Sequence, residues 1–358
     1  MSLSRRTVLR SLTAAALLPL VAGLAACGSD SDAGGSDGVA KEIRLGYFAN
    51  VTHAAALIGV DQGLFADELG DTDLKTQVFN AGPDVIEGIF SGNLDAAYIG
   101  PSPTINGYGQ SQGDALRIIA GAASGGAQLV VRDGIDTPAD LKGKTLATPQ
   151  LGNTQDVALR TWLTSQGLKN SVKDGGDVTI SPAANADTLT AFADGKIDGA
   201  WVPEPFASRM VLESKGHVLV DEKDLWDDGM FVTTHLIVRK EFLDKYPKTV
   251  AALLRGHVAA VELATDDPDK AKQAVNDGLE KAGGKKLAAD VLDRAWSNLT
   301  VTYDPLAATL QESEEHGVTA GTLAEKVDLK GIYDLGPLNE ILKDKGLDTV
   351  SAAGLDKK

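Results

Sequence analysis

Cysteine is nearly missing from this 358-residue chain, in which Cys27 stands alone. A single cysteine can form neither an internal disulfide nor a cysteine-ligated metal site. The five histidines are scattered and never form a His-x-x-x-His pair, so zinc chemistry is not expected. We therefore expect no metal and no cofactor.

Positive charge is also scarce, because 34 Lys and Arg stand against 50 Asp and Glu, a net charge of −16. Nucleic acid would be repelled and no basic cluster offsets the repulsion, so we expect no nucleic-acid partner. Any anionic ligand has to be held by local groups. The sequence also has no Gly-x-Ser-x-Gly, no phosphate loop and no Gly-x-Gly-x-x-Gly after a strand, which argues against an enzyme.

The N-terminus has the features of an export signal rather than of a membrane span. A basic start with Arg5 and Arg6 precedes an apolar run from Leu12 to Ala26, which is shorter than the roughly 20 residues a span needs. The paired arginines resemble a twin-arginine signal. Leu24-Ala25-Ala26-Cys27 resembles a bacterial lipobox, although a plain secretory signal with an incidental cysteine is the alternative. We expect residues 1–27 to be a lipoprotein signal ending in lipidated Cys27, residues 28–40 to be a flexible tether, and the chain to be anchored on the outer face of the cell membrane.

A repeated segment indicates that the remaining chain has two lobes. Gly92 to Pro103 and Gly195 to Pro205 share a glycine, an aliphatic residue, an aspartate, an alanine, an aromatic residue and a proline-bearing elbow in the same order. Each copy reads as a turn, a buried strand and the start of a helix. Two related α/β units in a chain of this length predict two lobes whose elbows face each other across a cleft.

Strand-like and helix-like segments alternate from Ile43 to Ala120, which predicts a mostly parallel sheet covered on both faces. Ligands of such sheets lie beyond the carboxyl ends of the strands, where helix starts offer unpaired N–H groups. Any single elbow is compatible with an ordinary capped turn, but their convergence favours a site. The candidate contacts at these elbows are Asn50, Thr52, His53, Gly82, Pro83, Gly100, Pro101 and Ser102.

The second lobe supplies further candidates. We expect a hinge at the glycine-rich bend 121–127, with Ser124 and Gly125, and a return strand at 231–238 in which Thr234 borders the cleft. We interpret His235 as a hydrogen-bonded strand residue. The elbow Gly152-Asn153-Thr154-Gln155 carries more hydrogen-bonding side chains than a helix cap needs and is the strongest candidate.

The chain resembles the solute-binding lipoproteins of bacterial ABC importers for sulfonate, nitrate and taurine, and is most similar to their aliphatic-sulfonate branch. The resemblance is carried by Leu45-Gly46-Tyr47 with Thr52-His53-Ala54, Ile99-Gly100-Pro101-Ser102-Pro103, Ala123-Ser124-Gly125-Gly126, Thr148-Pro149-Gln150-Leu151-Gly152-Asn153-Thr154 and Trp201-Val202-Pro203-Glu204-Pro205. It implies an α/β, two-lobed type II periplasmic-binding-protein fold with two crossings between the lobes and C-terminal helices packed on lobe one. Lobe one would comprise residues 41–124 and 233–350, and lobe two residues 125–232.

The resemblance also implies a function and partners. We expect a monomer that captures an aliphatic sulfonate or a similar small organic anion and delivers it to a permease and its ATPase. A nitrate, taurine or pyrimidine-precursor receptor is the alternative, followed by an enzyme resembling pyrimidine synthases. Trp201 and Glu204 complete the candidate contacts. Trp201 is also compatible with a core role, and Glu204 either pairs with a ligand amine or is an ordinary first-turn helix residue.

Overall fold

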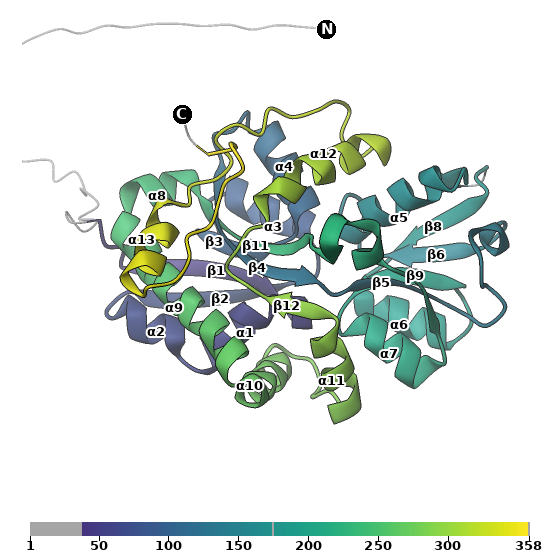
Figure 1. Ribbon diagram of the computed structural model, residues 1–358, viewed down its shortest axis with the longest axis horizontal. Coiled ribbons are helices and arrows are strands. Elements are labelled where there is room, and N and C mark those ends of the chain that lie inside the picture. Colours follow the sequence, from purple (N-terminus) through teal and green to yellow (C-terminus); the bar gives the residue numbers. More distant parts are fainter. Residues whose placement is uncertain (1–37, 174, 357–358) are drawn as a thin grey trace, which may run out of the picture. The chain divides into compact units, whose positions relative to one another are not determined.

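The computed structural model describes residues 38–173 and 175–356. The predicted signal, Cys27 and residues 28–37 of the predicted tether lie outside this range. Within the described residues the strands form two six-stranded sheets (Figure 1). The two sheets with their covering helices are called the first and second lobes below, and the exact domain boundaries stay a prediction.

The first sheet has the order β12-β4-β11-β3-β1-β2 and the second the order β10-β5-β9-β6-β8-β7. The first sheet contains β1 (Glu42–Phe48), β2 (Asp73–Phe79), β3 (Ala96–Ile99), β4 (Leu116–Gly125), β11 (Val232–Arg239) and β12 (Leu299–Val301). The second contains β5 (Ala127–Val131), β6 (Thr145–Thr148), β7 (Asn170–Ser171), β8 (Val178–Pro182), β9 (Gly199–Pro203) and β10 (His217–Asp221).

Helices cover both sheets. They are α1 (Ala54–Asp61), α2 (Leu64–Leu69), α3 (Gly82–Phe90), α4 (Pro101–Gln110), α5 (Thr154–Ser165), α6 (Asn185–Ala193), α7 (Phe206–Ser214), α8 (Lys240–Lys245), α9 (Pro247–Asp266), α10 (Pro268–Lys281), α11 (Ala289–Ser297), α12 (Leu310–Thr319) and α13 (Gly336–Asp344). A 3₁₀ turn, Val51–His53, precedes α1, so Thr52 lies within this turn and does not cap the helix.

The repeated segment occupies the same place in both sheets. β3 lies between parallel β1 and antiparallel β11, and β9 lies between parallel β6 and antiparallel β5. Both strands are buried along their whole length, which explains their apolar and small residues. The two copies therefore form the centre of their sheets, and the elbow that follows each lies at the carboxyl edge of the parallel strands.

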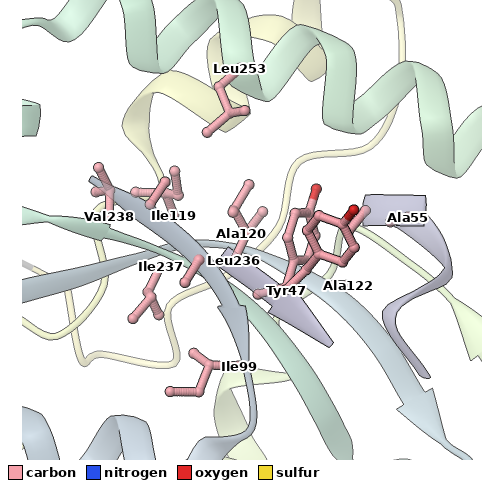
Figure 2. Packing of buried hydrophobic residues seen from close by; sticks show 14 of the residues in the cluster. Tyr47, Ala55, Ile99, Ile119, Ala120, Ala122, Leu236, Ile237, Val238 and Leu253 are labelled. Atoms are coloured by element: carbon pink, nitrogen blue, oxygen red, sulfur yellow. The ribbon is translucent and has the colours of Figure 1, made fainter. Parts of the chain in front are cut away.

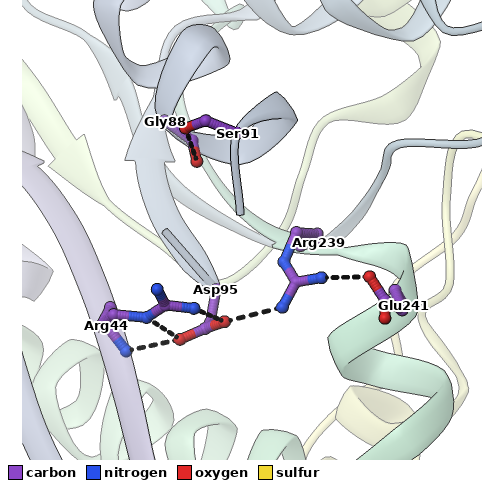
Figure 3. A network of polar contacts seen from close by, with 6 residues as sticks. All are labelled: Arg44, Gly88, Ser91, Asp95, Arg239 and Glu241. Carbon is purple, nitrogen blue, oxygen red and sulfur yellow. Dashed lines mark hydrogen bonds and ion pairs between the residues drawn. The ribbon is translucent and has the colours of Figure 1, made fainter. Parts of the chain in front are cut away.

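The aspartate of each repeat ties its strand to the neighbouring parallel strand. Asp95 accepts the backbone N–H of Arg44 (3.0 Å), and Asp198 accepts the backbone N–H of Thr145 (2.8 Å). Asp95 is only 2% exposed and also pairs with the guanidinium groups of Arg44 (2.7 Å) and Arg239 (3.0 Å) (Figure 3). This network joins β1, β3 and the end of β11 at the edge of the sheet opposite the elbows.

The chain crosses between the sheets at two points, after β4 and before β11. At the first crossing Gly125 and Gly126 both have φ near the left-handed region (75° and 76°), which a glycine adopts without strain. The bend expected over 121–127 is confined to these two residues. β4 continues to Gly125 because β11 and β12 pair with it on both sides, both at Ser124.

The C-terminal helices cover the first lobe, and two of them also reach the second. α9 and α10 pack on α1, and α13 packs on α9 and β4. Figure 2 shows Val238 and Ile237 of β11 on opposite sides of the sheet, with Leu253 of α9 on the side of Val238. α11 also contacts α7, where Arg294 donates to Ser208 Oγ (2.8 Å), and α12 also contacts α5, where Thr161 Oγ1 donates to the His316 carbonyl (3.0 Å).

The two repeated aspartates allow a matched stability test. Asp95→Ala leaves two arginines without their buried carboxylate and should lower the free energy of unfolding by roughly 3 kcal/mol. Asp198 is 31% exposed and its lysine partner 3.8 Å away, so Asp198→Ala should cost about 1 kcal/mol or less. Denaturant unfolding measures both. Equal losses would contradict the role assigned to the Asp95 network.

Candidate ligand-binding site

A small cavity lies where the elbows of the two lobes meet, at the carboxyl edges of both sheets. Its volume is about 20 Å³, close to the room that one water molecule needs. The first lobe lines it from β1, the turn before α1, β2, β3 and β11, and the second lobe from β9 and the starts of α5 and α6. The lining residues are Phe48, Asn50, Thr52, His53, Asn80, Gly100, Asn153, Thr154, Gln155, Asn185, Pro203, Thr233 and Thr234.

Three buried oxygen atoms in this cavity have no hydrogen-bond partner among the described residues. They are Thr154 Oγ1, Thr234 Oγ1 and Asn185 Oδ1. Buried polar atoms are almost always hydrogen-bonded, because an unpaired one costs about 1–3 kcal/mol. Three such atoms at one cavity, contributed by both lobes, indicate a binding site for a polar group.

His53 is the ionisable residue of the cavity lining. Its Nδ1 accepts the backbone N–H of Phe48 (3.3 Å), and the Phe48 ring packs on the imidazole with centroids 4.4 Å apart. Burial lowers the pKa of His53 to about 3. The ring is therefore neutral near pH 7, and because Nδ1 acts as acceptor, Nε2 carries the hydrogen that the ring can donate.

The elbow 152–155 contacts the first lobe directly. Asn153 Oδ1 accepts the backbone N–H of Gly82 (3.3 Å), so this oxygen does not cap α5. A Cβ at Gly100 would lie 2.2 Å from Thr154 Oγ1, and one at Gly82 would lie 3.1 Å from Asn153 Oδ1. The two glycines therefore allow the start of α5 to approach the first lobe.

Two backbone N–H groups expected to hold the ligand are already used inside the protein. That of Gly82 donates to Asn153, and that of Gly152 donates to Asp156 Oδ2 (2.9 Å). The start of α4 is also poor in donors, since Pro101 and Pro103 have no N–H. The cavity thus depends more on side chains, and less on helix N-termini, than the sequence suggested.

Glu204 faces away from the cavity. Its fully buried carboxylate accepts hydrogen bonds from Asn298 Nδ2 (2.6 Å) and the Ser208 backbone (3.0 Å) and pairs with Arg294 (3.2 Å). Burial raises its pKa, and these donors partly offset the increase. Its carbonyl accepts the N–H of Val51 from the first lobe (3.1 Å). Glu204 therefore joins the two lobes and does not contact a ligand in this conformation.

The structure brings together part of the predicted set. The predicted residues that line the cavity are Asn50, Thr52, His53, Gly100, Asn153, Thr154, Gln155 and Thr234. Those that do not are Gly82, Pro83, Pro101, Ser102, Ser124, Gly125, Gly152, Trp201 and Glu204.

The predicted residues that do not line the cavity have other contacts in this structure. Trp201 is fully buried in the second lobe and donates its indole N–H to Glu222 (2.7 Å). Ser124 Oγ accepts the N–H of Phe231 (3.4 Å), and the Gly125 carbonyl accepts from Thr233 Oγ1 (2.6 Å). These residues support the core and the crossing.

The lining residues Phe48, Asn80, Asn185 and Pro203 were not predicted from the sequence, whereas Thr233, next to Thr234 on the return strand, was expected to border the cleft. Asn80 directly follows β2 and Asn185 begins α6, shortly after β8. An asparagine within three residues of the end of a parallel strand was therefore the signal that could have identified both. The described residues contain no group of three or more His, Cys, Asp or Glu placed to hold a metal ion.

Comparisons with known proteins agree with this architecture. A model of the NMT1-like family matches residues 37–276. A putative aliphatic sulfonates-binding protein of Bacillus subtilis (strain 168) is 26% identical over 92% of this chain and 95% of that protein. The taurine-binding periplasmic protein of Escherichia coli (strain K12) is 29% identical over 57% of this chain and 61% of that protein.

The fold has a counterpart among solved structures. The alkanesulfonate-binding protein SsuA from Xanthomonas axonopodis pv. citri, bound to MOPS, superposes with a TM-score of 0.66 at 21% identity, covering 81% of this chain and 96% of that one. This likeness confirms the two-lobed binding-protein fold, and the sequence matches confirm the family resemblance. The chain belongs to the NMT1-like family.

Proposed function

We propose that this chain is the extracytoplasmic solute-binding lipoprotein of an ABC importer and captures an aliphatic sulfonate, or a similar small organic anion, between its lobes. The observation that carries the proposal is the cavity with three unpartnered buried oxygens and the neutral His53 donor. The names of the relatives support the solute class. As parts of the same proposal, the chain delivers its solute to a permease and is anchored through Cys27. No helix of the described residues is long and apolar enough to cross a membrane.

The donors of the cavity match an anionic head group. A sulfonate has three oxygens that accept hydrogen bonds, and the hydroxyls of Thr154 and Thr234 can turn their hydrogens toward it. His53 adds its ring N–H, and rotation of the Asn185 amide presents its NH₂ group. Hydrogen bonds to a charged acceptor contribute about 1.5–3 kcal/mol each. Neutral donors therefore suffice to hold the anion.

Ligand binding would favour the closed state. Thr234 and His53 belong to the first lobe, and Thr154 and Asn185 to the second. An anion bound by both sets has a higher affinity for the closed arrangement than for an open one, which is the differential affinity that a conformational switch requires. Since the cavity measures only about 20 Å³, room for about one water molecule, the lobes must separate to admit a sulfonate and must close less tightly around it than they do here.

The residues that line the cavity also bear on the alternative ligands, taurine and nitrate, and on an enzymatic role. Taurine carries an ammonium group, but no carboxylate lines the cavity among the described residues, and Glu204 is engaged with Arg294 and Asn298. This favours a sulfonate without an amine. Nitrate is smaller than a sulfonate and can use the same donors, so it is the second candidate. An enzymatic role has less support, since His53 alone among the lining residues could transfer protons and its pKa is far from neutral.

The function can be tested by calorimetry on the chain that begins at Gly28. We expect 1-butanesulfonate to bind with a Kd on the order of micromolar or below, and more tightly than taurine or nitrate, because its head matches the donors and its tail has room outside the cavity. Absence of heat with any alkanesulfonate would refute sulfonate capture. Tighter binding of nitrate would replace it with the second candidate.

Removing either unpartnered hydroxyl should have opposite effects on protein stability and on ligand affinity. Thr154→Val and Thr234→Val keep the side-chain shape and remove an unsatisfied polar atom, so the unliganded protein should be as stable or more stable. Each variant should bind 1-butanesulfonate about tenfold or more weakly, since a hydrogen bond to a charged group is lost.

Thr249→Val is the matched control for these two variants. Its buried Oγ1 accepts the N–H of Ala40 (2.8 Å), so this variant should lose stability and keep its affinity. Thermal unfolding and calorimetry give both readings. Unchanged affinity in Thr154→Val and Thr234→Val would remove these hydroxyls from the site.

Because His53 is neutral, we expect the affinity for 1-butanesulfonate to depend little on pH near neutrality. Because the pKa of buried His53 is lowered to about 3, the ring stays neutral throughout the physiological range. A bound anion would raise that pKa, so affinity should increase only as the pH falls toward 3. The Kd for 1-butanesulfonate should therefore change by less than about twofold between about pH 5 and pH 8. A steady loss of affinity between pH 6 and 8, abolished in His53→Gln, would show a cationic His53 instead.

A further inference from the structure

A larger groove adjoins the cavity and is formed by both lobes. Its volume is about 280 Å³, and Asn50, Asn80 and Asn185 line both spaces. These three amides therefore stand at the junction between the small cavity and the groove. The groove is close to the lower end of the size range of small-molecule pockets, about 300 Å³, so it can take a part of a solute that the cavity cannot.

The walls of the groove suit a carbon chain. Val78 and Phe79 of β2 line it from the first lobe, Phe206 of α7 lines it from the second, and Leu279 and Leu287 close it from α10 and the segment after it. Val78 is 38% exposed although it is apolar. Burying such side chains against methylene groups is favourable by about 25 cal/mol per Å².

The charges of the groove are all positive. Arg209 and Lys285 line it, and no Asp or Glu does among the described residues. This is unusual in a chain with a net charge of −16. Arg209 uses its Nε to pair with Glu213 (3.0 Å), which leaves both terminal nitrogens as donors. The neighbouring Lys286 pairs with Asp277 and Glu280, whereas Lys285 has no such carboxylate partner among the described residues.

We infer that the solute is an acid with two heads: a sulfonate in the cavity and a second acidic group, joined to it by a short carbon chain, on Arg209 and Lys285. This inference rests on the proposed function for the position of the first head. The chain passes between the three asparagine amides and lies on the apolar walls. The second acid completes the hydrogen bonding of the Arg209 guanidinium and neutralises Lys285 in a groove that no carboxylate of the protein lines.

The experiment compares one-headed and two-headed probes on the chain that begins at Gly28. Calorimetry with 1-butanesulfonate, and with propane-, butane- and pentane-α,ω-disulfonate, identifies the length that spans the two subsites. At least one disulfonate should bind about tenfold more tightly than 1-butanesulfonate, the gain expected from one charge-assisted contact. Arg209→Gln and Lys285→Gln should each remove most of this gain and change the affinity for 1-butanesulfonate less than about twofold.

Two controls separate a specific subsite from general charge effects. Lys343→Gln removes one positive charge from an exposed position on α13 and should leave all affinities unchanged. Glu213→Gln removes the carboxylate partner of Arg209 and keeps its cation, so the disulfonate should bind at least as tightly as before. Thermal unfolding of every variant confirms that it is folded.

The outcomes that overturn the inference are distinct from failure of the proposed function. A disulfonate that binds no tighter than 1-butanesulfonate refutes the second head. Equal weakening of both probes in Arg209→Gln and Lys285→Gln also refutes it, because the two cations would then only attract anions to the cleft. If 1-butanesulfonate and all disulfonates fail to bind, the proposed function itself fails and the second head with it.

Discussion

A Cβ atom at Gly100 would lie 2.2 Å from Thr154 Oγ1, so the Thr154 hydroxyl can occupy its place against the first lobe because Gly100 has no side chain. At Gly82 a Cβ would lie 2.3 Å from Pro103 Cγ and 3.1 Å from Asn153 Oδ1, and the Gly82 N–H donates to that amide oxygen. This close approach brings the hydroxyls of Thr154 and Thr234 to one small cavity. The closed arrangement leaves these hydroxyls without partners, which costs free energy. An anionic ligand that accepts hydrogen bonds from them would remove this cost.

The small cavity can bind an anion through neutral donors alone. The protein carries a net charge of −16, which opposes an incoming anion at long range. Neutral hydroxyls, amides and the N–H of a neutral histidine form the cavity, and Arg209 and Lys285 lie in the groove next to it. Two buried carboxylates close to the cleft are each paired with an arginine: Glu204 with Arg294, and Asp156 with Arg160.

The fold could be predicted because its signals are local. The repeat at 92–103 and 195–205, and the elbows that follow buried strands, gave two lobes and eight of the lining residues. What escaped prediction depends on distant partners. Arg294 and Asn298 reach Glu204 from α11 and the residue after it, and Asn153 takes the N–H that Gly82 was expected to offer. β12, a strand of three residues between helices, has too little pattern to be recognised from sequence.

A crystal structure of the chain that begins at Gly28 with 1-butanesulfonate would show whether the cavity holds the sulfonate. We expect its oxygens within about 2.5–3.2 Å of Thr154 Oγ1, Thr234 Oγ1 and His53 Nε2, with the butyl chain leaving between Asn50, Asn80 and Asn185. A sulfonate bound by Arg209 or Lys285 instead, with both threonine hydroxyls still unpartnered, would contradict it.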